Sequence, residues 1–144
     1  GVLNDFTNDA DRRLIFQRFA DWLAPGGVLI FDVRDWNASA SRYSKQPIAS
    51  RHVALKDGSE LFFESYTVPN HNTRELRVRE TFEHRHGEMA TRTENGFSMR
   101  CWSRAELEQM LAIDFRDVSI HPTYGEPDGV RIDRMVATAI STLI

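Results

Sequence analysis

The sequence predicts an α/β fold in which one buried strand is followed by an inserted antiparallel β-meander. Pro25-Gly26-Gly27 ends a helix, because proline lacks a backbone donor and glycine accepts left-handed angles. The almost wholly apolar run 28–33 comes next, which is typical of a strand buried on both faces in a parallel sheet. Alternating β-rich segments between residues 48 and 102 predict the meander.

The composition is that of an ordinary globular domain. The chain has 144 residues, which is one domain by size, with 41% hydrophobic and 27% charged residues. The net charge of −3, with both signs interspersed, excludes a strongly basic nucleic-acid or membrane surface. A single cysteine, Cys101, excludes an internal disulfide framework. With no membrane-length apolar run and no signal peptide at its start, we expect a cytoplasmic protein.

The first element is an amphipathic helix. Thr7 or Asn8 can cap it, and Asp9 and Asp11 in its first turn complement the helix dipole. Apolar residues then recur at helical spacing up to about Leu23. This helix and the strand 28–33 form half of a βαβ unit, whose first strand would lie just before Gly1 and is missing.

Residues 37–47 are rich in Ser and Ala, and we expect a mobile loop there, which could include a helical turn, that arches over the strand end. The meander follows: a strand at 51–56, a hairpin turn at Asp57-Gly58, and a return strand at 60–68 that is broken at 69–72. A third strand follows, in which Leu76, Val78 and Phe82 oppose Arg77, Arg79 and Glu83. A fourth runs from Met89 to about Trp102, interrupted at Asn95-Gly96. The alternating Arg and Glu of the third and fourth strands predict cross-strand charge pairs.

Helical signals return after the meander. Ser103 and Glu106 form a capping box, in which each side chain satisfies the backbone donor of the other. Strands are then expected at 115–120 and from 133 to about 140, separated by the turn-rich segment 122–129.

Three segments carry a resemblance to a known family. These are Gly1-Val2-Leu3-Asn4-Asp5-Phe6, then residues 23–33, and then Met99-Arg100-Cys101-Trp102-Ser103 with the following helix. Together they resemble class I S-adenosylmethionine-dependent methyltransferases of the small-molecule type. The resemblance implies a partial domain: the C-terminal half of a Rossmann-like methyltransferase sheet with an inserted antiparallel β-meander. Its parts would be 1–36 (helix and buried strand), 48–102 (β insert) and 103–144 (helix and closing antiparallel strand pair).

The chain departs from this family in lacking a glycine-rich nucleotide loop, because Gly26-Gly27 precedes a strand instead of following one. We therefore expect a truncated chain, a proteolytic fragment or one half of a split protein. The intact parent would use S-adenosylmethionine to methylate a small molecule. The chain alone is expected to be inactive and to bind the cofactor weakly or not at all.

The resemblance also assigns candidate site residues, each with a structural alternative. Asn4 and Asp5 would lie near the methionine part of the cofactor, or would only form a turn. Arg34 and Arg100 could pair with a substrate carboxylate, or could form internal ion pairs, Arg34 with Asp35 or a nearby glutamate. Three aromatic side chains could line a pocket for the methyl acceptor: Trp36, Tyr43 and Tyr124. Their structural alternative, which is the more frequent role of aromatic residues, is packing in the core or against loops. No catalytic acid or base is assigned.

Other chemistry is less well supported. Histidines 52, 71, 84 and 86 lack the convergent acids or thiolates of a metal site, and Cys101 beside Trp102 indicates a buried structural thiol. Two alternatives remain for the function: a non-enzymatic binding or dimerisation module, and an α/β enzyme that binds a different nucleotide. Because the strand 28–33 would lack a neighbour, we also expect a homodimer formed across that open edge, unless the meander covers it.

Overall fold

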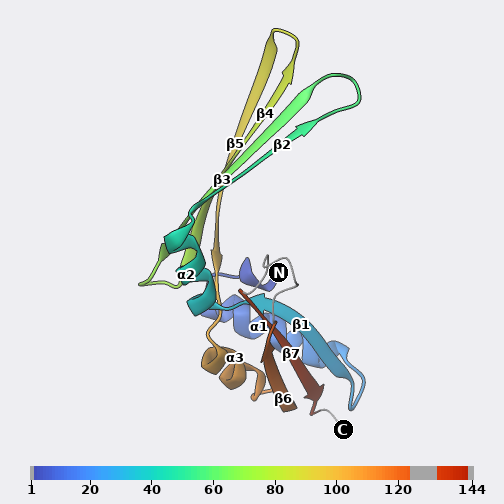
Figure 1. Cartoon of the computed structure of the whole chain (residues 1–144). Helices are drawn as coiled ribbons and strands as arrows, with labels where there is room; N and C mark the ends of the chain where they lie inside the picture. Colours follow the sequence, from blue (N-terminus) through green and yellow to red (C-terminus); the bar gives the residue numbers. More distant parts are fainter. Residues whose placement is uncertain (1, 124–132, 143–144) are drawn as a thin grey trace.

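The computed structural model describes residues 2–123 and 133–142. Its elements are η1 (Val2–Asn4), α1 (Asp9–Trp22), β1 (Val28–Arg34), α2 (Trp36–Lys45), β2 (Ile48–Ala54), β3 (Glu60–Asn70), β4 (Glu75–His86), β5 (Met89–Arg100), α3 (Arg104–Leu111), β6 (Phe115–Pro122) and β7 (Arg134–Ser141). Figure 1 shows two parts: a body built from α1, α3 and one sheet, and a long arm formed by strands β2–β5 that rises from it.

The body contains a three-stranded antiparallel sheet in the order β1-β7-β6. The expected antiparallel closing pair, β6 with β7, is confirmed. The expectation of a parallel sheet around β1 is wrong for the described residues. Here β1 pairs antiparallel with β7, and parallel pairing is limited to one bridge between Asp35 and Trp102. The other edge of β1 has no strand partner within residues 2–123 and 133–142.

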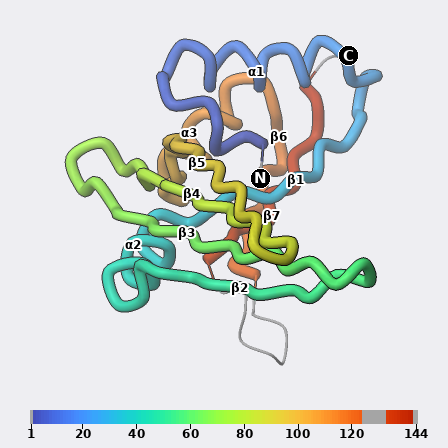
Figure 2. The backbone as a smooth tube through the Cα atoms, turned by 90° about the horizontal axis from the view of Figure 1, so that it is seen from above, coloured from blue at the N-terminus to red at the C-terminus, as the bar shows by residue number. Residues whose placement is uncertain are grey.

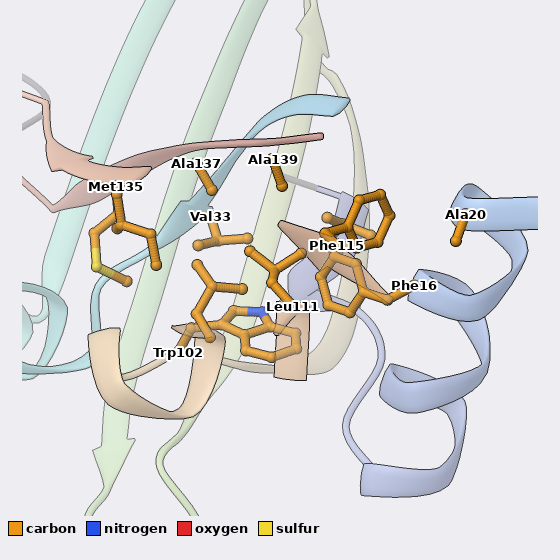
Figure 3. Close-up of a cluster of buried hydrophobic side chains, with 12 residues drawn as sticks. Phe16, Ala20, Val33, Trp102, Leu111, Phe115, Met135, Ala137 and Ala139 are labelled. Atoms are coloured by element: carbon orange, nitrogen blue, oxygen red, sulfur yellow. The ribbon is translucent and has the colours of Figure 1, made fainter. Parts of the chain in front are cut away.

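One face of this sheet forms the core. Along β7 buried and half-buried residues alternate, and the small side chains of Ala137 and Ala139 let the helices approach closely. Phe16 of α1 and Leu111 of α3 belong to the same cluster, with Trp102 fully buried between the two helices and the sheet (Figure 3). Burying side chains of this size contributes about 1.5–3 kcal/mol each to folding.

The opposite face of the sheet is open. Val28 and Ile30 of β1 point away from the core and are 54% and 67% exposed. The prediction that this strand is buried on both faces is therefore wrong for this chain. The helices α1 and α3 both pack against the core face, so the apolar side chains of the other face have no described layer above them.

The arm is a four-stranded antiparallel meander in the order β2-β3-β4-β5. The Asp57-Gly58 hairpin is confirmed, since Gly58 takes a left-handed φ of +81° that other residues rarely adopt. The first strand begins three residues earlier than expected, at Ile48. The expected interruption at Asn95-Gly96 is wrong, because β5 pairs with β4 without a register shift along its whole length.

The two faces of β4 differ as the sequence predicts. Leu76 and Val78 are buried, whereas Arg77 and Arg79, which alternate with them along the strand, are exposed. The predicted cross-strand charge pairs between β4 and β5 are not formed. The ion pairs within residues 75–100 join neighbours two apart on one strand: Glu83 with Arg85, and Arg92 with Glu94.

The segment expected to be a mobile loop is the helix α2. Its N-cap is Asp35, whose side chain accepts a hydrogen bond from the Ala38 N–H at 2.8 Å. Trp36, Ser39 and Ala40 form its buried face, at the i, i+3, i+4 spacing of an amphipathic helix. The helix packs against β3 at the base of the arm, so tertiary packing stabilises a sequence whose Ser-rich composition favours a loop.

A fully buried arginine joins the arm to the body. The guanidinium of Arg12 lies 3.7 Å from the centre of the Trp102 ring and donates to the carbonyls of Phe6, Arg100 and Cys101. It also donates to Glu106 at 3.2 Å. The same Glu106 completes the predicted capping box with Ser103, which is confirmed. Arg12 therefore connects α1, the end of β5 and the start of α3.

Candidate functional site

The candidate site lies at the carboxyl end of β1, where η1, α2, the start of β7 and the base of the arm converge. This is the end of an α/β sheet at which functional groups gather. Two backbone bonds fix the geometry: the Asp35 N–H donates to the carbonyl of Asp133 at 2.8 Å, and the Trp36 N–H donates to the carbonyl of Trp102 at 2.9 Å.

Asn4 is brought into this site. Its side chain is 1% exposed, and its Oδ1 accepts a hydrogen bond from the Arg34 backbone N–H at 3.3 Å. Its Nδ2 is buried and has no hydrogen-bond partner among the described residues. A buried donor without a partner is costly, so this amide is suited to meeting a further acceptor group. Asp5, in contrast, is exposed to solvent beside it.

Arg34 forms an internal ion pair, as its structural alternative predicts, but with a different partner. Its guanidinium donates to Oδ2 of Asp133, which is 2% exposed. Arg42 also reaches this oxygen at 3.4 Å, and the Ser39 hydroxyl donates to it at 3.4 Å. Asp35, the expected partner, caps α2 instead.

Sequence reasoning missed Asp133 and Ser39 as members of this site. The other carboxylate oxygen of Asp133, Oδ1, is buried and has no partner within the described part of the chain. Asp133 lies 99 residues from Arg34 in the sequence, and no local pattern relates the two, which explains why Asp133 was not predicted. Its position just before an apolar strand is the only signal that the sequence offers.

The aromatic candidates lie beside the charged cluster. Trp36 is buried with Ala40, Leu76 and Cys101, and Tyr43 packs against this group. The Trp36 ring meets the His71 ring edge-on, with centroids 5.3 Å apart. Tyr43 borders a small hollow of about 110 Å³ between α2 and strands β2 and β3. Burial raises the pKa of Cys101 to about 11, so this thiol is neutral at physiological pH, and its prediction as a buried structural thiol is confirmed.

One of the predicted substrate residues, Arg100, is not brought to this cluster. The guanidinium of Arg100 pairs with Asp9 at 2.7 Å and with Glu106 at 2.8 Å, and donates to the carbonyl of Thr7. It therefore lies at the junction of α1 and α3. Tyr124 lies outside the described residues.

Two further properties concern the described residues, 2–123 and 133–142: their helices and their possible metal ligands. None of their helices is long and apolar enough to cross a membrane. Nor do they contain a group of three or more His, Cys, Asp or Glu side chains able to hold a metal ion.

Comparison of the whole structure identifies a methyltransferase fold. A structure described as an S-adenosylmethionine-dependent methyltransferase from Clostridium acetobutylicum matches 96% of this chain, with a TM-score of 0.67 and 16% identity. The sugar N-methyltransferase KedS8 from Streptoalloteichus matches 95% with a TM-score of 0.73 and 15% identity. CalS10, a SAM-bound amino pentose methyltransferase from Micromonospora echinaspora, matches 94% with a TM-score of 0.64 and 18% identity.

The chain spans about half the length of these structures, 54%, 52% and 53% respectively. No protein family and no curated protein matches the sequence itself. The chain therefore has the fold of small-molecule methyltransferases over about half of their length, and the predicted α/β fold class with an antiparallel insert is confirmed.

Proposed function

We propose that this chain is the acceptor-side, C-terminal half of an S-adenosylmethionine-dependent methyltransferase that acts on a small molecule. The observation that carries the proposal is the incomplete sheet of the body. Within residues 2–123 and 133–142, one edge of β1 has no strand partner and Val28 and Ile30 are exposed, in a fold that matches methyltransferases over about half of their length. The edge is also bordered by an apolar hollow of about 410 Å³, lined by Leu3, Phe6 and other residues of η1, α1 and β1. A further strand and covering helices would bury these surfaces.

The residues present fit only part of a cofactor site. The sequence contains no glycine-rich loop that follows a strand, so it offers no complete nucleoside site. Asn4 does fit: its buried Nδ2 is a donor without a partner, at the end of the sheet where β1 stops. We assign Asn4, with the exposed carboxylate of Asp5, to the methionine part of the cofactor. The cofactor, when bound, supplies an electrophilic methyl group.

The acceptor side is formed by the Arg34 cluster. The ion pair with Asp133 holds the Arg34 guanidinium in place, so it can orient an acceptor at little entropic cost. Trp36 and Tyr43 exclude water on the side facing the arm. An amine acceptor would attack through its lone pair and then release a proton to solvent, so no strong acid or base is required. The amine acceptors of CalS10 and KedS8, a pentose and a sugar, support this choice. The ion pairs of Arg100 favour its structural alternative.

Calorimetry with two proteins tests the proposal. This chain alone should show no micromolar affinity for S-adenosylmethionine, whereas a protein extended at its N-terminus should bind it. In the extended protein, Asn4→Ala should weaken cofactor binding about tenfold, the equivalent of one lost hydrogen bond. Asn37→Ala, at an exposed position of α2, is the matched control and should bind as the parent does. Micromolar binding by the chain alone would refute the proposal of a missing cofactor half.

We further propose that the chain, when expressed alone, forms a homodimer across the free edge of β1, in a cytoplasmic setting that suits its buried free thiol. Light scattering over a range of concentrations tests this. Ile30→Lys should weaken association, because Ile30 is exposed beside that edge, whereas Val53→Lys on the arm is the control. If Val53→Lys is instead the variant that dissociates the dimer, the arm is the interface. The alternative of a non-enzymatic dimerisation module then gains support.

A further inference from the structure

Three arginines of the arm, Arg51, Arg77 and Arg79, have no carboxylate partner among the described residues, and Arg77 and Arg79 lie on the same face of it. Arg77 and Arg79 are exposed on β4, and neither forms an ion pair or a side-chain hydrogen bond. Among the described arginines this is unusual, because most of them pair with an acid: Arg12, Arg13, Arg18, Arg34, Arg42, Arg74, Arg85, Arg92, Arg100, Arg104, Arg116 and Arg134. Two adjacent unpaired guanidinium groups are a ready binding site for an anion.

The two arginines share one face of the arm, which we call the open face. Because successive strand residues point to opposite sides, Arg77 and Arg79 oppose Leu76 and Val78, which are buried on the side of α2. Because α2 packs with Leu76 at the base of the arm, the open face is the face of the arm that is turned away from α2. Figure 2 shows α2, from above, beside β3.

The strand register places an aromatic side chain beside these cations. Tyr66 of β3 lies directly opposite Arg79, and Val68 opposite Arg77. Tyr66 is 40% exposed, and its hydroxyl is a further donor at the same surface. Facing pairs of this kind lie about 5 Å apart, so the ring and both guanidinium groups can contact one ligand.

On the other flank the surface is unobstructed. The β5 residues opposite Arg79 and Arg77 are Gly96, which has no side chain, and Ser98, whose side chain is small. A Cβ atom added at Gly96 would meet only the Val78 carbonyl oxygen, at 3.9 Å, so no side chain fills this space. Farther along the arm, the same face continues into a hollow of about 420 Å³, whose lining includes the stacked pair His52 and Phe62.

We propose that Arg77 and Arg79, with Tyr66, bind the anionic group of the small-molecule acceptor, a phosphoryl or carboxylate group. The guanidinium-bearing residues are two apart on a strand, and their Cα atoms are therefore about 7 Å from each other, a spacing that the oxygens of a diphosphate or a dicarboxylate can bridge. The assignment rests on the proposed function for the identity of the ligand as acceptor. Arg34 is already neutralised by Asp133, so Arg77 and Arg79 are the better anchors for a negative group.

Calorimetric titration of the chain with inorganic pyrophosphate and with malonate at low salt tests the proposal without any cofactor. The double variant R77Q/R79Q should lose at least tenfold in affinity for the ligand that binds better. Stronger binding of pyrophosphate indicates a phosphoryl acceptor, and stronger binding of malonate a carboxylate. Circular dichroism verifies that each variant is folded. Wild-type affinity in the double variant, or no binding of either anion by the parent chain, would overturn the proposal.

A pair of charge insertions provides the matched control. Gly96→Glu places a carboxylate on the open face directly opposite Arg79 and should also abolish anion binding. Asn95→Glu adds the same charge one residue away, on the opposite face, and should change the affinity less than twofold. Equal losses in both variants would mean that general repulsion, not a site, governs binding. If the extended protein fails to transfer methyl groups but these anion results hold, the proposed function fails and the anion site stands.

Discussion

Replacement of Arg12 by methionine should destabilise the protein by about 2–4 kcal/mol. The guanidinium donates to the carbonyls of Phe6 and Arg100 at short range and to Glu106, and hydrogen bonds to charged groups contribute about 1.5–3 kcal/mol each, so their loss costs about 4.5–9 kcal/mol before any offset. Against this loss, methionine removes the cost of burying a charge, which is several kcal/mol. That cost is visible in the pKa of Arg12, which burial first and repulsion from Arg100 second lower to about 10. In the methionine variant the Glu106 carboxylate still pairs with Arg100, so the substitution does not leave the negative charge of Glu106 without a partner.

The conservative replacement Arg12→Lys is the sharper test. Lysine keeps the buried positive charge but lacks the planar fork that reaches Phe6 and Arg100 together, so its burial is less well compensated. We therefore expect Arg12→Lys to be at least as destabilising as Arg12→Met. Urea unfolding with linear extrapolation measures both. Arg104→Met removes an exposed ion pair with Glu108 and, as the control, should cost less than about 0.5 kcal/mol. A lysine variant within about 1 kcal/mol of the parent would refute this account of Arg12.

Other predictions concern local features. Ser103→Ala removes one side of the capping box and should lower the free energy of unfolding by about 1 kcal/mol, measured in urea. Native Cys101 should not react with a thiol reagent at pH 8, whereas the urea-unfolded chain should; rapid native labelling would contradict its burial. Because burial raises the Cys101 pKa from 9.0 to about 11, the unfolded thiol ionises first. Stability should thus be intact below about pH 9 and fall between about pH 9 and pH 11, an effect absent in Cys101→Ala.

Elements with a strong local signal were predictable from the sequence. The helix α1 follows from an Asn8 cap and an apolar stripe, and the cap is observed. The Asp57-Gly58 turn and the capping box of Ser103 likewise depend only on residues within one turn. The helix α2 was missed because its stability comes from the Asp35 cap and from packing on β3, while its Ser-rich sequence has no strong helical pattern.

Only part of the candidate site could be found from the sequence. Arg34 directly follows the expected strand 28–33, Asn4 was assigned by the family resemblance, and the structure brings the two into contact. The partner of Arg34 could not be found, because Asp133 is 99 residues away and charges of both signs occur throughout the chain. The burial of β1 was overestimated for a related reason. An apolar run indicates that a strand is suited to two covering layers, but those layers belong to other segments.

The position of β7 in the middle of its sheet sets the order in which the chain can fold. β1 and β6 each hydrogen-bond to β7, which follows both of them in the chain, and Val28 pairs with Ile140 across more than a hundred residues. The arm, by contrast, is built from hairpins between consecutive strands, whose contacts are close in sequence. Such short-range contacts form fast, and long-range pairing is slow. During synthesis, the arm can therefore form while the β7-facing edge of β1 waits without its partner until β7 emerges.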